Sequence, residues 1–328
     1  MTQRLRQLAL ANVPIILLIV VFVIFSLWDP RFFDVQTLAN VARSTAYIGI
    51  VAVGMTLVLM TAGIDLSVGS MLYLTAVIVG QVINAAALPV FVVPLIAIGV
   101  GVVLGAVNGF AISFLRLVPF IVTLAMLTVF RGAGLGLSQS REVNYPDVIT
   151  QLGAQPLLGI PLPVWVFALV VLVAHLVVTR TPFGRQLLAT GEDRAAAERA
   201  GIPVRRVLFT VYVIAGALTG LAAFVAMTQL RTAAPGFGSG DEFDAIAAAV
   251  LGGTSLFGGR GSVFPGTVVG ALLIQLIQTG LQFLQVDLYV TPMIQAGIIL
   301  LAVFIDAART GRLEKLTRRV VMSERTEG

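Results

Sequence analysis

Long runs of apolar residues constrain this sequence more than any other feature. The 328 residues are 58% hydrophobic and only 11% charged, and the mean hydropathy is +1.00. A soluble domain carries about 25% charged residues, so this chain cannot cover itself with a water-compatible surface. Lipid leaves no partner for free backbone groups, and no strand-like alternation is visible, so the spans are helices. The sequence predicts an all-α polytopic membrane protein, with residues 1–328 forming a single transmembrane domain.

Charged or Pro/Gly-marked breaks divide the sequence into about ten segments long enough to cross a bilayer, which takes about 20 apolar residues each. The first run lacks the small-residue cleavage site of a signal peptide, because Trp28 and charged residues follow it. We therefore expect it to remain as the first span. The expected spans are 13–28, 44–62, 69–86, 89–115, 118–138, 163–179, 206–229, 244–258, 263–284 and 290–306.

Basic residues divide unevenly between the two sides that ten spans create. With the N-terminus inside, 16 of the 21 basic residues fall inside, together with the C-terminus. Loops rich in basic residues stay on the cytoplasmic side, so both termini are expected in the cytoplasm. The net charge of +5 then reflects topology and gives no reason to expect a nucleic-acid partner. The five basic residues expected outside are Arg31, Arg43, Arg131, Arg141 and Arg231.

Catalytic and metal-binding residues are scarce. The chain has no cysteine and a single histidine, His175, which excludes thiolate sites and argues against zinc or haem. We expect no metal and no cofactor. His175 is interpreted as a packed residue, the alternative being a proton relay. No nucleophile–base set or carboxylate pair is visible in the spans, so the chain is not expected to be an enzyme.

The charged loop at 180–205 has the marks of a short, bounded helix. Thr190 is expected to cap its start and Asp193 to reach back, while Gly201 ends it and Pro203 blocks continuation. So short a helix is marginal in water and is expected to dock on another protein. The alternative is a surface helix that only joins two spans. The candidate contact residues are Gly191, Glu192, Asp193, Ala195, Ala196, Arg199, Ala200, Gly201 and Ile202.

The turn at 63–70 holds Asp65 among apolar residues at a membrane edge. An ionisable group in such a place is costly and is a candidate for solute contact. Asp65 also lies two residues before Ser67, where it can cap the next helix through the amides of residues 67–69. We favour the cap, with solute contact as the alternative.

A few polar residues lie inside the expected spans. Asn108 is one candidate for a polar path, and Gln275, Gln278 and Gln282 share one helix face at positions i, i+3 and i+7. This glutamine stripe could line a solute path or hydrogen-bond neighbouring helices.

The glycine-rich segment 252–262 resembles a phosphate loop only in part. Gly259 and Arg260 stand where Lys-Ser/Thr is required, and Lys315 is the only lysine. We interpret the segment as a tight turn on the same side as the turn at 63–70. The chain itself is not expected to bind ATP there.

Several motifs, in order, resemble the permease subunits of bacterial monosaccharide ABC importers of the ribose, xylose and galactofuranose type. The resemblance covers nearly the whole chain. The motifs are Gly49-x4-Gly54-Met55-Thr56-Leu57, Gly63-Ile-Asp-Leu-Ser-Val-Gly-Ser70, Pro119-Phe-Ile-Val-Thr-Leu124 with Arg131-Gly132, Gly184, Gly191 to Gly201-Ile202, Phe243-Asp-Ala-Ile-Ala247, Leu251-Gly-Gly-Thr-Ser255 and Gly258-Gly259.

The resemblance implies a multi-pass subunit of the bacterial inner membrane that forms a sugar path and uses the 180–205 loop to contact an ATPase. The implied partners are a second permease copy or paralogue, a cytoplasmic ATP-binding subunit that hydrolyses ATP, and a periplasmic sugar-binding protein. The alternative is a secondary transporter driven by an ion gradient, for which Asp65 and His175 are the only candidate coupling residues. The sequence leaves open which sugar is carried and whether the permease pairs with itself.

Overall fold

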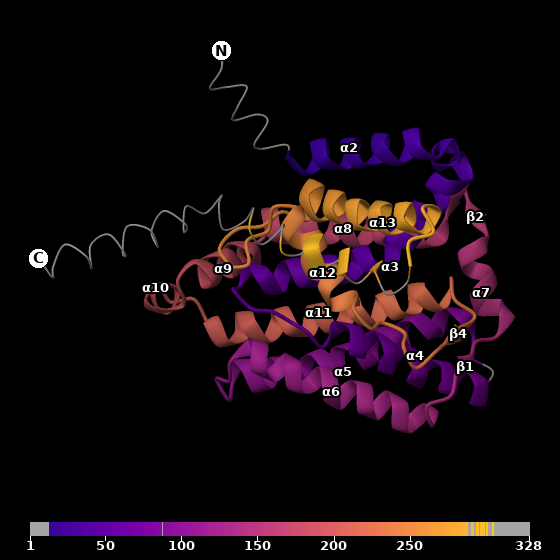
Figure 1. The fold of residues 1–328 in the computed structure, drawn as a ribbon. Helices are drawn as coiled ribbons and strands as arrows, with labels where there is room; N and C mark the ends of the chain where they lie inside the picture. The colour runs from indigo at the N-terminus through magenta and orange to yellow at the C-terminus, as the bar shows by residue number, and fades with distance from the viewer. Residues whose placement is uncertain are drawn as a thin grey trace, which may run out of the picture.

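The computed structural model describes residues 13–86 and 88–287, with residues 290, 291, 293, 294, 296–298, 300 and 304. Within these residues, seven helices are long and apolar enough to cross a membrane. The long helices form one bundle (Figure 1), which confirms the all-α polytopic class. The helices are α2 (Val13–Trp28), α3 (Val35–Met60), α4 (Val68–Ala85), α5 (Val93–Ser113), α6 (Pro119–Ser138), α7 (Asp147–Ala154), α8 (Leu162–Arg180), α9 (Pro182–Glu192), α10 (Arg194–Arg199), α11 (Val204–Met227), α12 (Asp241–Leu251) and α13 (Val268–Phe283).

Among the residues that the structure describes, four short strands lie in the connecting segments. They form two antiparallel pairs, β1 with β4 and β2 with β3. The strands and α7 lie at one end of the bundle, whereas α9 and α10 lie at the other (Figure 1). Trp165 donates its indole N–H to the Leu157 carbonyl, 3.1 Å away, at the strand-bearing end. The strands are β1 (Val143–Asn144), β2 (Pro156–Leu157), β3 (Ile160–Pro161) and β4 (Thr232–Ala233).

The second helix is longer than the sequence predicted. It begins at Val35, nine residues before the expected start at residue 44, because its first turns carry polar residues that do not read as a span. Its 26 residues extend about 39 Å. Arg43 therefore lies inside α3, and Arg131 likewise lies inside α6. Arg43 had been expected in an outside loop, whereas Arg131 had been counted on the outside although it falls within the expected span 118–138. Only three of the five basic residues counted as outside therefore lie in segments that connect these long helices.

The expected span 244–258 is wrong. Helix α12 begins at Asp241 and ends at Leu251, so its 11 residues extend only about 16 Å, half of the roughly 30 Å hydrocarbon core. Gly253 adopts a φ of +95°, a left-handed conformation that glycine tolerates and that ends the helix. The apolar run continues past this point in sequence, but the backbone turns away. The expected span 290–306 lies largely outside the described residues.

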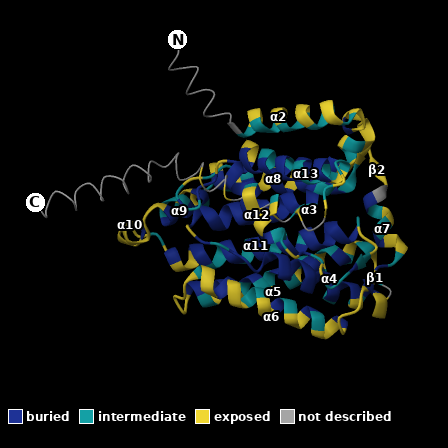
Figure 2. Ribbon diagram, viewed as in Figure 1, coloured by how far each residue is buried: buried dark blue, intermediate teal, exposed yellow. Residues whose placement is uncertain are grey.

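The core is centred on α3, while several other helices form an outer layer. In its most apolar stretch, 78% of the residues of α3 are buried, against 22% in α5, α6 and α8. Figure 2 shows α3 largely dark blue, with exposed residues along α5 and α6. Apolar side chains on the outer layer therefore face outward, as expected for helices that contact lipid.

Helices α5 and α11 cross at very short range through small residues. A Cβ atom at Gly101 would lie 2.1 Å from the Gly216 carbonyl oxygen, and one at Gly105 would lie 2.3 Å from the Tyr212 carbonyl oxygen. Small residues spaced four apart let helix backbones approach closely in membranes. Gly101 and Gly105 are therefore packing positions, where the absence of a side chain allows the two helices to approach. A Cβ atom at Gly99, which is exposed, would meet no atom of the described residues within 4 Å.

Candidate functional site

The 180–205 segment folds as two short helices, α9 and α10, rather than one. Pro182 follows the cap Thr181 and starts α9 earlier than expected. Asp193 caps α10, because its Oδ1 accepts a hydrogen bond from the Ala196 amide at 3.0 Å. This bond holds the pKa of the Asp193 carboxyl below its usual value, so the cap stays charged at neutral pH. The expected cap, Thr190, is instead buried inside α9.

The end of α10 agrees with the sequence prediction. Gly201 adopts a φ of +81°, and its amide donates to the Glu198 carbonyl at 3.0 Å. The Ile202 amide donates to the Ala197 carbonyl at 3.0 Å, which completes a Schellman motif. Ala197 and Ile202 pack with Val204 at the start of α11. Because Ala197 is used in this packing, the other alanines of α10 point away from the protein.

The outer side of α9 and α10, at one end of the bundle, exposes most of the candidate contact residues (Figure 2). Seven of the nine are exposed, whereas Gly191 is buried and Ile202 partly buried. The seven are Glu192, Asp193, Ala195, Ala196, Arg199, Ala200 and Gly201.

Three backbone segments meet at Gly191, at the inner side of α9. A Cβ atom there would lie 1.8 Å from the Met60 carbonyl oxygen and 2.6 Å from the Gly259 nitrogen. The Gly259 amide donates to the same Met60 oxygen at 3.0 Å. Arg194 also reaches the Thr61 carbonyl, 3.3 Å away. The backbone of α9 at Gly191 is therefore in direct contact with the end of α3 and with the glycine-rich segment 252–262.

The break between α3 and α4 contains a buried polar cluster. Asp65 is 1% exposed, and its Oδ1 accepts from the Ser67 amide at 2.9 Å and from the Ser67 hydroxyl at 2.6 Å. Asn108 of α5 donates to the Ser67 hydroxyl oxygen at 2.7 Å. Three residues that the sequence singled out separately are thus brought together. Of the amides at 67–69 that the sequence prediction named, only that of Ser67, the residue before α4, donates to the Asp65 carboxylate among the described contacts. Capping of α4 by Asp65 stays a prediction.

Replacing Asp65 by Ala should destabilise the protein. The Ser67 amide and hydroxyl would be left buried without their acceptor, which costs about 1–3 kcal/mol. Asp65→Asn keeps an acceptor oxygen and should cost less. Thermal unfolding of the detergent-purified variants measures both effects, with the Ala variant melting lower than the Asn variant. Normal melting of both variants, together with an altered choice of solute, would instead support a role for Asp65 in the solute path.

The glutamine stripe of α13 does not act as one surface. Gln275 is buried and its amide lies 3.4 Å from the Thr279 hydroxyl. Gln278 donates to the Asp244 carboxylate of α12 at 2.7 Å, which is the interhelical role left open by the sequence. Gln282 is exposed and borders a polar cavity with Gln278. A role in the solute path therefore stays a prediction for Gln278 and Gln282. Gln275 does not line this cavity.

The sequence analysis did not identify the acidic residues at the start of α12 as candidate functional residues. Asp241, Glu242 and Asp244 all lie in its first turn, and Glu242 and Asp244 are buried. Three acidic residues at the start of an apolar run could have indicated a functional position from the sequence, because ionisable residues inside membrane proteins are usually functional. They were overlooked because the run after them was read as a full span.

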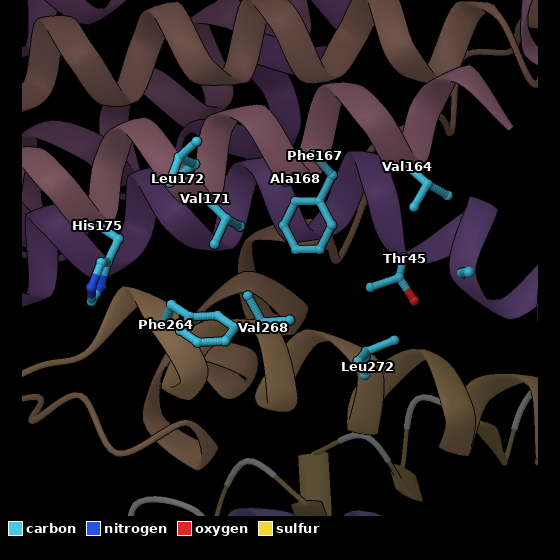
Figure 3. Close-up of a pocket in the computed structure, with 11 residues that line it drawn as sticks. Thr45, Val164, Phe167, Ala168, Val171, Leu172, His175, Phe264, Val268 and Leu272 are labelled. Carbon is cyan, nitrogen blue, oxygen red and sulfur yellow. The ribbon is translucent and has the colours of Figure 1, made fainter. Parts of the chain in front are cut away.

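An apolar cavity of about 450 Å³ lies between α8 and α13 and against α3 (Figure 3). Its lining includes Phe167, Val171 and Leu272, with Thr45 and His175 as its polar side chains. Thr45 bonds its own helix through the Val41 carbonyl. The His175 ring packs edge-on against Phe264 at 6.1 Å, consistent with the packed interpretation of this histidine. Such a groove offers a sugar too few hydrogen bonds and suits apolar chains.

Comparison with known proteins places the chain among transport permeases. The family described as branched-chain amino acid transport system / permease component matches residues 37–303. The ribose import permease protein of Escherichia coli K12 is 40% identical over 301 residues, 89% of this chain and 92% of that protein. The counterpart in Haemophilus influenzae is 37% identical over 296 residues, 89% and 91% of the two chains. The fructose import permease protein of Rhizobium meliloti is 33% identical over 306 residues, 90% and 85%. No solved structure matches the chain.

Proposed function

We propose that this protein forms the path of a monosaccharide across the bacterial inner membrane. The chain belongs to the permease components of ABC import systems, in the monosaccharide-importing group to which its relatives belong. The observation that carries the proposal is the likeness over about nine tenths of the chain to permeases named for sugars. These names favour an import permease over a secondary transporter driven by an ion gradient.

In this proposal the end of the bundle with α9 and α10 faces the cytoplasm, together with both termini. Arg180, Arg185, Arg194 and Arg199 belong to this end, as the distribution of basic residues in membrane proteins requires. The opposite end, with α7 and the short strands, then faces the periplasm and meets a sugar-binding protein. The whole chain acts as one transmembrane domain that pairs with a second permease copy or a paralogue.

The exposed face of α9 and α10 is proposed to dock into a groove on a cytoplasmic ATP-binding subunit. Small alanine side chains on this face allow close approach, and Asp193 holds the start of α10 rigid. The partner supplies ATP hydrolysis, and the permease needs no nucleotide site of its own. Closure of the ATPase would move α9, and the contacts of Gly191 with Met60 and Gly259 pass that movement to the end of α3.

Association with the ATPase is the first test of this proposal. The tagged permease, co-expressed with the ATP-binding subunit and sugar-binding protein of its own transport system, should retain the ATP-binding subunit through affinity and size-exclusion chromatography. The purified assembly should hydrolyse ATP. A permease that is purified alone, remains folded and imports sugar without any ATPase would contradict the proposal.

A further inference from the structure

A polar cavity lies where the start of α12 meets the end of α13. Its volume is about 270 Å³, close to the lower end of the roughly 300–1,000 Å³ that small-molecule pockets span. A small solute fits that size. The polar side chains around it come from three parts of the chain, namely Ser239 and the first turn of α12, the last turns of α13, and Thr291.

The hydrogen-bonding groups around this cavity are only partly used by the protein. Asp244 accepts from Gln278, at 2.7 Å. Asp241 lines the cavity, and its Oδ2 atom is buried without a hydrogen-bond partner among the described residues. A buried acceptor of this kind loses its hydration without compensation, and so calls for a further donor. Gln282 adds a carboxamide at the exposed side of the cavity.

The surroundings hold the carboxylates in place. The start of a helix favours negative charge, which supports Asp241 and Asp244 in the first turn of α12. Arg131 of α6 donates to the Phe237 carbonyl at 2.7 Å and lies 5.0 Å above the Tyr73 ring. It therefore fixes the loop that leads into α12. The cavity is thus bordered by groups whose positions are set by contacts with α6 and α13.

We propose that this cavity is a solute station, a site inside the permease that holds a monosaccharide by its hydroxyl groups during its passage. Carboxylates accept hydrogen bonds from sugar hydroxyls, and the Gln282 and Thr291 side chains both donate and accept. A site of oxygen ligands alone would suit a bare cation, whereas carboxamide N–H donors suit a hydroxyl-bearing solute. This proposal rests on the proposed function. It adds the cavity in which the solute would bind and the hydrogen bonds that would hold it.

The absence of cysteine in the sequence allows a direct test. The Gln282→Cys variant carries the only thiol of the chain, at the cavity. In the reconstituted complex with its ATPase, its rate of labelling by a water-soluble maleimide is measured with and without ribose, allose or fructose. The matched control is Gln155→Cys, which is exposed at the same end of the bundle and does not line the cavity.

We expect at least one of the three sugars to slow labelling of the Gln282→Cys variant several-fold and to leave the Gln155→Cys variant unchanged. Adding Asp241→Asn to the Gln282→Cys variant should weaken that protection. The station is wrong if no sugar protects the thiol, if the thiol does not react, or if sodium chloride protects in place of sugar. If sugar uptake persists but no sugar slows labelling of the thiol, the solute station is wrong and the proposed function stands. If a sugar slows labelling but uptake does not depend on ATP, the proposed function is wrong and the station stands.

Discussion

Replacing Ala196 or Ala200 by Arg should lower sugar uptake about tenfold or more while the permease still inserts and folds. Both alanines are exposed, Ala196 in α10 and Ala200 directly after it, so the new side chain has room in the isolated protein. In the assembly it would occupy the interface that we propose with the ATPase. A tenfold loss corresponds to about 1.4 kcal/mol of docking free energy. ATP hydrolysis should continue but no longer respond to the sugar-loaded binding protein.

The matched controls for these variants are Ala196→Ser and Ala200→Ser. Serine is close to alanine in size, so at these exposed positions it adds neither bulk nor charge to the α9–α10 face. Uptake by the serine variants should stay close to that of the unaltered protein. The docking face is assigned wrongly if Ala196→Arg and Ala200→Arg import sugar normally, and blocking by the arginine side chain is the wrong explanation if the serine variants are impaired to the same degree.

Replacing Gly101 by Leu should prevent correct folding. The Cβ atom alone would lie 2.1 Å from the Gly216 carbonyl oxygen and 2.9 Å from Gly220, so α5 and α11 would have to separate along their crossing. Overpacking of a core costs about 1–3 kcal/mol and more where only backbone can yield. The yield of monodisperse protein in size-exclusion chromatography should fall to a small fraction of the unaltered level.

Gly99→Leu is the matched control for this prediction. Gly99 lies two residues away on the same helix, and a Cβ there meets no atom within 4 Å. This variant should fold with a normal yield, because the leucine would extend away from the packed face. Equal yields for the two variants would show that the close crossing of α5 and α11 is not needed for the fold.

Local signals in the sequence predicted the elements that depend on neighbouring residues. The end of α10 is one example, since Gly201 and Pro203 determine it within a few positions. The start was assigned to Thr190 instead of Asp193, because both residues are competent caps and only the packing of α9 decides between them. The helical, membrane-embedded class likewise follows from composition alone.

Features that depend on contacts between distant segments were not predictable. The meeting of Gly191 with Met60 and Gly259 joins three parts of the chain, and no local pattern encodes it. Helix α12 was predicted as a full span because apolar residues continue past Leu251, although Gly253 turns the backbone there. The pairing of Asp244 with Gln278 also crosses between two helices, so each residue alone gave only half of the site.

We propose that this permease moves a monosaccharide with energy from ATP. The most direct test is uptake of radiolabelled ribose, allose and fructose by proteoliposomes that contain the complete transporter, with ionophores collapsing all ion gradients while ATP is held constant. We predict that uptake of at least one sugar continues unchanged and stops when ATP is withdrawn or replaced by a non-hydrolysable analogue. Uptake that is abolished by the ionophores and persists without ATP would contradict the claim and identify an ion-driven transporter.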